Sequence, residues 1–398
     1  MAIHRTMSYS GDSHTLGPAK AALYILGLVG TLGTWGRTVA DGTLVHLYTA
    51  LHGGSSYILP GTEYALKTSF TGIYWPIDYL LDVLVIFFWE SVDGSHPDSS
   101  AIGIYFLGQL FAILVPFYVN HLRGGNGPSI VTPTLWALSF QMGAIGFTGW
   151  IWALWFISSS PLLSSTASPD VRRRSASVNP RLVRAVLPAL LVGYAAPAVL
   201  MGIPSPGIVS NSFQQWAVVT WNIFPLTVMV LFKAFAGTGF PSDQRYVHDA
   251  GLHSVRTTYA ITLAISFAMH VAVVSLSIIT VLFPAIFDPS YRQYFSPASL
   301  FIPPLSIEAT KTVGDGIRSF FLWDQLGGYG VVLLVQLVQL RNAAYITGKQ
   351  FNWLNAIAST VFASLIVGPG STAVLINWWH DELLLGTNED SKAKNKTK

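Results

Sequence analysis

The sequence of 398 residues contains no cysteine, which excludes disulfides, thiolate catalysis and cysteine-ligated metals. Charged residues are also scarce, at 10% of the chain. The net charge of +3 is too small and too dispersed to favour binding of nucleic acid or of an acidic substrate. P-loop, G-x-S-x-G and H-E-x-x-H motifs are missing as well, so common nucleotide, hydrolase and zinc-protease chemistries have no support.

Hydrophobic residues are abundant instead, at 51% of the chain with a mean hydropathy of +0.49, as in polytopic membrane proteins. We expect one all-α transmembrane helical domain of about eight to nine helices over residues 1–386, followed by a polar, Lys-rich tail, 387–398. A span needs about 20 apolar residues to cross about 30 Å of hydrocarbon. The candidate spans are residues 18–36, 73–92, 101–121, 134–157, 184–203, 214–235, 258–284, 326–345 and 355–379.

The distribution of basic residues predicts the orientation of these spans. The Ser- and Pro-rich loop 160–181 contains three consecutive arginines and is therefore expected in the cytosol, with segment 285–325 in the lumen. The tail 387–398 has conflicting signals. Its ending K-N-K-T-K resembles a cytosolic dilysine signal for return to the endoplasmic reticulum, whereas Asn395 begins a glycosylation sequon usable only in the lumen. Nine spans would place the tail in the lumen, and a merely solvated tail is a third reading.

Two carboxylates lie inside the second expected span, Asp78 and Asp82. An ionisable residue at the bilayer centre costs about 2.5–3.5 kcal/mol on insertion scales, so each one is a functional hypothesis. Residues four apart project from one helix face. Desolvation and mutual repulsion are expected to raise the pKa of at least one of them. A protonated carboxyl group in an apolar pocket would serve as a Brønsted acid.

Other polar residues fall at a similar depth when nine spans alternate in direction. Gln141, Asn222 and Asp324 would then join the aspartates in a polar chamber within one leaflet. Gln141 and Asn222 could instead be interhelical hydrogen-bond partners, which membrane bundles use routinely. His270, deep in the seventh expected span, could be a proton relay or a packed core histidine.

Aromatic residues form 13% of the chain. Most near helix ends suit an interfacial belt. Trp75 and Tyr79 flank the paired aspartates and Trp323 precedes Asp324, so these rings could line the chamber. The face of such a ring attracts a carbocation by up to about 2 kcal/mol. The acidic clusters that bind magnesium diphosphate, such as D-D-x-x-D, are missing from the sequence, so we expect neither a metal nor a cofactor.

Five stretches together, in order and spacing, resemble the fungal integral membrane terpene cyclases of meroterpenoid pathways, of the ascochlorin, ascofuranone and macrophorin type. The resemblance covers about residues 70–386. The stretches are IDYLLDVLVIFFWESVDGSHPDSSAIGIYFLGQLFA, HLRGGN, WNIFP, FLWD and WWHDELLLG.

This resemblance implies a class II type of cyclisation without a metal. An acid protonates a terminal epoxide or alkene of a farnesyl chain on a polyketide-derived ring, and the cation closes and is quenched. An acidic residue of the family pattern is replaced here by Asn120. The motif matches carry over Asp78, Asp93, Gln109, Arg123, Asn126, Asp324, Asp381 and Glu382.

We therefore expect a terpene cyclase of the endoplasmic reticulum whose partners are the lipid bilayer and a prenylated aromatic or epoxidised farnesyl substrate. Asp78 is the first choice for the acid, Asp82 its pKa-raising neighbour and Asp324 the competing donor. The expected substrate-binding residues are Trp75, Tyr79, Gln109, Arg123, Gln141, Asn222, His270 and Trp323. The rival function is a proton-coupled transporter of a secondary metabolite, in which intramembrane carboxylates relay protons.

Overall fold

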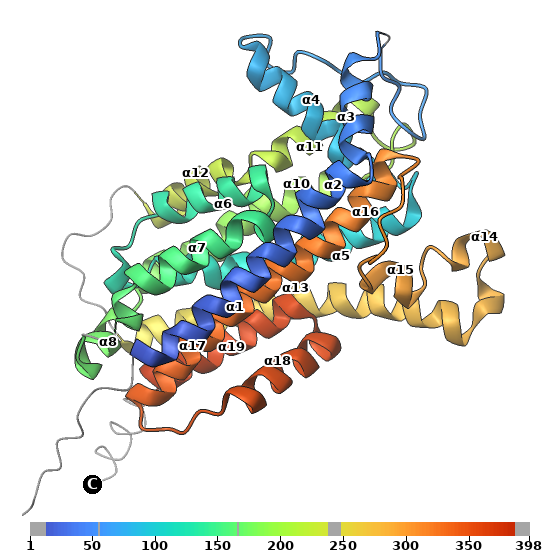
Figure 1. The fold of residues 1–398 in the computed structure, drawn as a ribbon. Coiled ribbons are helices and arrows are strands. Elements are labelled where there is room, and N and C mark those ends of the chain that lie inside the picture. Colours follow the sequence, from blue (N-terminus) through green and yellow to red (C-terminus); the bar gives the residue numbers. More distant parts are fainter. Residues whose placement is uncertain (1–12, 55, 165–166, 238–247, 387–398) are drawn as a thin grey trace, which may run out of the picture.

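The structure is a computed structural model that describes residues 13–54, 56–164, 167–237 and 248–386. These residues form helices and loops without a β-strand, which confirms the all-α class (Figure 1). The α-helices are α1 (Ser13–Thr31), α2 (Arg37–Ala40), α3 (Thr43–His52), α4 (Trp75–Trp89), α5 (Pro97–His121), α6 (Val131–Gly143), α7 (Ile145–Ser159), α8 (Pro169–Ser175), α9 (Pro180–Leu190), α10 (Ala196–Met201), α11 (Asn211–Asn222), α12 (Phe224–Ala236), α13 (His248–Leu282), α14 (Pro289–Arg292), α15 (Pro297–Phe301), α16 (Val313–Asp324), α17 (Gly330–Ile346), α18 (Trp353–Val367) and α19 (Pro369–Leu385).

Five of the described helical segments are long and apolar enough to cross a membrane, a smaller number than the nine expected spans. They are Leu16–Ala40, Pro97–His121, Pro180–Met201, Gly251–Leu282 and Val313–Ile346. Helices α11 and α12 make a sixth segment if the pair, bent by 70°, counts as one span. The bend follows from Pro225, at the second position of α12, because proline cannot continue the hydrogen-bond ladder of a preceding helix.

The fourth expected span is a helical hairpin, so the prediction that it crosses the membrane is wrong. Helices α6 and α7 meet at Ala144, whose φ of 72° reverses the chain. The rings of Phe140 and Trp152 lie 6.0 Å apart and those of Trp136 and Trp155 lie 5.6 Å apart. In the second pair both residues lie farther from the turn than in the first pair, which is the pattern of two antiparallel helices.

The ninth expected span also turns back. Helix α18 ends at Gly368, whose φ of 90° suits glycine, and Pro369 starts α19. One groove is lined both by the pair Ala363 and Thr372 near the turn and by the pair Ala356 and Trp379 far from it. The two helices therefore run antiparallel and converge at their common turn (Figure 1).

The second expected span is too short to cross. Helix α4 has 15 residues, about 22 Å at 1.5 Å per residue, against about 30 Å of hydrocarbon. It stands with α3 at one end of the bundle (Figure 1). Asp78 and Asp82 therefore lie on a short terminal helix and not in the middle of a span.

Ion pairs and hydrogen bonds identify the two ends of the bundle. At one end Arg123 reaches Asp381 on α19, and Arg172 of the basic loop donates to Asn342 of α17. At the other end His96 bridges Asp98 and Asp315. The basic loop 160–181 and the C-terminal end of α19 thus share one end, and segment 285–325 lies at the other (Figure 1).

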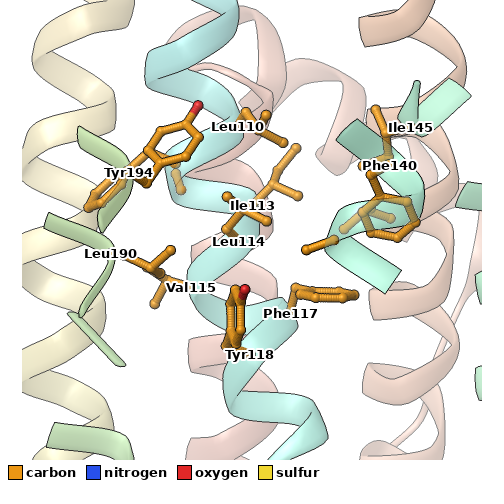
Figure 2. Packing of buried hydrophobic residues seen from close by; sticks show 14 of the residues in the cluster. Leu110, Ile113, Leu114, Val115, Phe117, Tyr118, Phe140, Ile145, Leu190 and Tyr194 are labelled. Carbon is orange, nitrogen blue, oxygen red and sulfur yellow. The ribbon is translucent and has the colours of Figure 1, made fainter. Parts of the chain in front are cut away.

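Helix α5 is the centre of the core. Its residues Leu110, Leu114 and Phe117 are buried among side chains from α6, α7 and the α9–α10 segment, including Phe140 and Tyr194 (Figure 2). A helix that is apolar on all sides must be covered on all sides by protein or by lipid, and α5 is covered mostly by protein. The remaining spans are arranged around α5 and expose apolar faces, as expected for contact with lipid.

Candidate functional site

A pocket of about 300 Å³ lies beside α5, within the size range of small-molecule sites. Its wall combines α3, α4 and α16 with the turn between α6 and α7 and the bend between α11 and α12. Broken helices therefore supply two parts of the wall, and backbone breaks at membrane depth are typical of places that line a cavity.

Asp324 is the carboxyl group in this pocket wall, and its side chain is buried. It ends α16, directly before a π-helical segment, Gln325–Tyr329. The Gly146 N–H, in the first turn of α7, donates to Asp324 Oδ1 at 2.6 Å. Among the described residues Oδ2 has no hydrogen-bond partner. The positive end of the α7 dipole therefore faces one carboxyl oxygen and leaves the other available.

Glycines allow α1, α7 and the π-helical segment to meet at Asp324. A Cβ on Gly30 would collide with the Gly146 carbonyl oxygen, and one on Gly327 would lie 2.7 Å from the Gly30 Cα. A Cβ on Gly146 would lie 3.0 Å from Asp324 Oδ1. The hydrogen bond that orients the carboxyl group thus depends on this close backbone contact.

Gln141 also lines the pocket, and its Nε2 donates to Asn222 Oδ1 at 2.7 Å. Asn222 in turn donates to the Val218 carbonyl within α11. The two amides therefore hydrogen-bond across helices, as the alternative reading expects, and their role in substrate binding stays a prediction. Their bond ties the end of α6 to the bend between α11 and α12.

Aromatic rings form most of the deep wall. Phe106 stacks on Phe321 at 4.9 Å, and Phe88 meets Trp221 edge to face at 5.0 Å. All four rings line the pocket and are buried. The Trp221 Nε1 is buried and has no hydrogen-bond partner among the described residues. The deep wall therefore offers aromatic faces and one N–H donor.

Asp78 and Asp82 are buried on the side of α4 that faces away from the pocket. The side that lines the pocket contains Tyr79, Leu80, Val83, Leu84, Phe87 and Phe88. Backbone N–H groups of Thr71 and Gly72 donate to Asp78 and hold the pKa of its carboxyl below the usual range, although burial acts against this. Burial, and secondly the charge of Asp78, raises the pKa of Asp82 to about 6. The expected raised pKa thus belongs to Asp82, while Asp78 is held ionised.

Gln109 and His270 lie together, at the turn between α18 and α19 and away from the pocket wall. Gln109 Oε1 accepts from the Gly370 N–H at 2.9 Å, and its Nε2 donates to the Ser266 carbonyl. His270 faces the Tyr105 hydroxyl at 3.0 Å through Nδ1. Both side chains hold the helical hairpin against α5 and α13.

Arg123 is fully buried at the end of the bundle that holds the basic loop. It donates to Asp381 Oδ1 at 2.6 Å, to Asn120 Oδ1 at 2.8 Å and to the Ala176 carbonyl at 2.8 Å. Asn126 donates to the Asn120 carbonyl at 2.7 Å. Arg123 and Asn126 of the L-R-x-G-N match and Asp381 of the D-E match therefore belong to one polar network remote from the pocket. Glu382 pairs with Arg256 instead.

Three other predicted residues have separate surroundings. Trp75 is 75% exposed at the start of α4, and Trp323 packs against Gly33 and donates to the Pro304 carbonyl. Asp93 accepts from the Ser95 backbone in the turn after α4. Of the predicted site residues, the pocket wall contains Tyr79, Gln141 and Asp324.

The described residues contain no group of three or more His, Asp or Glu side chains arranged to hold a metal ion. The pocket residues that the sequence did not predict are apolar and aromatic side chains such as Phe88, Phe106 and Phe321. Their only signal was the high aromatic content, which does not say which rings face a cavity.

An apolar pocket with one buried carboxyl group, enclosed in a helical membrane bundle, fits an enzyme that acts on a hydrophobic small molecule. Comparison with known families is specific: the CtvD domain family matches residues 19–385, and this chain belongs to that family. The prediction of a fungal meroterpenoid-type terpene cyclase family is thereby confirmed.

The chain is 27% identical over 337 residues to the terpene cyclase ctvD of Aspergillus terreus, covering 80% of this chain and 87% of the relative. It is 25% identical over 388 residues to the terpene cyclase ascI of Acremonium egyptiacum, covering 95% and 96%. The terpene cyclase penA of Penicillium crustosum is 24% identical over 352 residues, covering 82% and 86%. No solved structure matches the chain.

Proposed function

We propose that this protein is a membrane-bound terpene cyclase of fungal meroterpenoid biosynthesis that closes a prenyl chain, most simply a farnesyl chain, without a metal. The reaction starts when a carboxylic acid protonates a terminal epoxide or alkene of the substrate. The observation that carries the proposal is the single buried carboxyl group of Asp324 in an aromatic pocket. The proposal therefore assigns to Asp324 the role of the acid, for which Asp78 was the first choice in the sequence analysis.

The hydrogen bonding of Asp324 suits a proton donor. Oδ1 accepts from the Gly146 N–H, so a proton carried on Oδ2 can be directed at the substrate. When that proton moves to an epoxide oxygen or an alkene carbon, the carboxylate that remains faces the N-terminus of α7. This stabilises the conjugate base and makes the carboxyl group a stronger acid at the moment of transfer.

The cation that forms next is electron-poor carbon, and the deep wall contains Phe88, Phe106, Trp221 and Phe321. Ring faces stabilise positive charge by up to about 2 kcal/mol in a dry site. A neighbouring alkene of the chain supplies the electrons for ring closure, and loss of a proton ends the sequence. One proton enters and one leaves, so the overall reaction is an isomerisation with no need of an oxidant or reductant.

Substitution of the three candidate acids by asparagine tests the assignment in microsomes that receive farnesylated phenols and their terminal epoxides. Asp324→Asn keeps the oxygen that accepts from Gly146 and removes only the acidic proton. General acid catalysis contributes typically 10²–10⁴-fold, so we expect turnover to fall by about that factor at normal membrane abundance. Asp78→Asn and Asp82→Asn are the matched controls and should retain turnover.

Full activity of Asp324→Asn would refute the role of this carboxyl group, and loss of activity in Asp78→Asn alone would return the role to α4. Turnover should also survive excess EDTA, because the proton comes from a carboxyl group and no diphosphate must be neutralised. Loss of turnover on chelation, restored by magnesium, would instead favour ionisation of a diphosphate.

We also propose the endoplasmic reticulum as the location. The C-terminal end of α19 lies at the same end of the bundle as the arginine-rich loop, which the positive-inside rule assigns to the cytosol.

A further inference from the structure

At the exposed side of the pocket, His52 contacts the aromatic rings of both Tyr48 and Tyr79, and we call these three side chains the rim platform. The rings of Tyr48 and His52 stack at 4.3 Å with 21° between their planes, and those of His52 and Tyr79 lie 5.8 Å apart. Tyr48 and Tyr79 line the pocket, although they are 62% and 38% exposed. The rim platform is therefore open to the outside and continuous with the cavity.

The carboxyl group of Asp324 lies in the pocket wall away from the rim platform. Along α4 the lining runs from Tyr79 to Phe88, nine residues or about 14 Å of helix. Phe88 lies 5.9 Å from Phe321, which precedes Asp324 by one turn. An extended farnesyl chain has a comparable length, so a substrate can reach from the mouth to the acid.

We propose that the rim platform binds the oxygenated aromatic ring of a prenylated substrate, so that the prenyl chain enters the pocket with its terminus first. This inference rests on the proposed function and adds the orientation of the substrate and the class of its head group. A substrate bound the other way would place its ring at Asp324 and leave the reactive end of the chain outside.

The chemistry of the rim platform fits an oxygenated ring. Tyr48 and His52 cover one face of each other, so a substrate ring would stack on an opposite face. The hydroxyls of Tyr48 and Tyr79 can donate to or accept from a phenol oxygen. His52 uses Nδ1 toward the Tyr48 carbonyl at 3.1 Å, and its Nε2 has no partner among the described residues. Tyrosines are common anchors at the membrane interface, but an anchor does not require two tyrosines to line one cavity around a shared histidine.

Ligand binding to Asp324→Asn tests the proposal without relying on turnover. Two probes are compared by quenching of tryptophan fluorescence in nanodiscs: a farnesylated phenol and a farnesyl methyl ether that has no aromatic ring. Each of Tyr48→Leu and His52→Leu, made in the Asp324→Asn background, should weaken binding of the phenol by about three- to tenfold, the range typical of one aromatic contact. Binding of the ether should remain unchanged.

Tyr48→Phe and Tyr291→Leu serve as matched controls. The first keeps the stacked ring and should retain most of the affinity for the phenol. The second removes a 50% exposed tyrosine at the same end of the bundle, outside the pocket wall, and should have no effect. Equal weakening of both probes, or no weakening of either, would overturn the assignment of the ring to the rim platform.

Photolabelling gives the orientation directly. A farnesylated phenol with an azide on the ring should label α3 and α4, and one with a diazirine at the chain terminus should label α16. The reversed pattern would overturn the orientation. The role of Asp324 as the acid is tested separately from the orientation of the substrate. If Asp324 is not the acid, Asp324→Asn retains turnover while the binding and labelling results are unaffected.

Discussion

The buried ion pair between Arg123 and Asp381 predicts that Arg123, a residue carried over from the family motif, has a structural role and does not bind the substrate. Both side chains are 0% exposed and their atoms Nη2 and Oδ1 are 2.6 Å apart. Arg123→Met keeps the aliphatic stem but leaves Asp381 with His380 at 2.8 Å and Tyr259 at 3.3 Å. It also leaves the Ala176 carbonyl without its Arg123 donor.

Removing one partner of a buried pair typically costs 3–5 kcal/mol, because the other charge stays buried. At about 2–4 °C per kcal/mol, the apparent unfolding temperature should fall by roughly 6–20 °C, with this long chain near the lower limit. Tryptophan fluorescence of the detergent-solubilised protein measures that shift. The double variant Arg123→Met/Asp381→Leu should recover most of the loss, since an apolar pair of similar size replaces the ions without a stranded charge.

Glu382→Gln is the control, because Glu382 follows Asp381 directly in the sequence but forms an ion pair with Arg256 that is about one-third exposed. Exposed pairs contribute about 0–1 kcal/mol, so the unfolding temperature should barely change. An Arg123→Met protein with wild-type stability and no turnover would refute this reasoning and restore the substrate-binding role.

Three further predictions concern topology, pH and substrate binding. Tags in the loop 160–181 and after Gly386 should be equally accessible to protease in sealed microsomes, and a tag in segment 285–325 should be protected. If the tag after Gly386 were protected while the tag in loop 160–181 was cleaved, the α18–α19 hairpin would have to cross the membrane. The pKa of Asp82 is about 6, above the unfolded value, so the folded protein binds this proton more tightly and loses stability as pH rises from about 4 to 6. Asp82→Asn should remove this pH dependence, as measured by thermal unfolding at pH 5 and pH 7.5. An unchanged pH dependence would assign it to another group. Trp221→Phe removes a buried N–H that has no partner in the described chain, so stability should persist while KM for an oxygenated substrate rises about two- to tenfold; an unchanged KM would show that this N–H does not contact the substrate.

Hydropathy predicted the fold class and most of the membrane segments, because apolar length is what a bilayer demands. Hydropathy could not predict whether an apolar stretch crosses the membrane or folds back within the bundle. The stretches 134–157 and 355–379 are long enough to cross, yet each folds back within the bundle. Gly368-Pro369 is a recognised break signal and could have warned of the second hairpin. Ala144 gives no such signal, since a left-handed alanine is set by tertiary packing.

The candidate site was only partly predictable for a related reason. Gln141, Asn222 and Asp324 stood out because polar groups are costly in a membrane, and the first two do meet. Asp78 and Asp82 stood out by the same rule, but the sequence does not show that their face of α4 turns away from the cavity. The aromatic wall comes from helices distant in sequence, and their side-by-side arrangement is a property of the fold.

The position of the pocket mouth has a consequence for kinetics. Tyr48, at the pocket mouth, is 62% exposed and lies beside helices whose outer faces are apolar. A prenylated substrate partitions strongly into lipid, at about 0.8 kcal/mol for each buried CH₂. The enzyme therefore meets its substrate at a concentration set by moles of substrate per mole of lipid. Added vesicles dilute that substrate and slow the reaction, even when the amount per millilitre is constant.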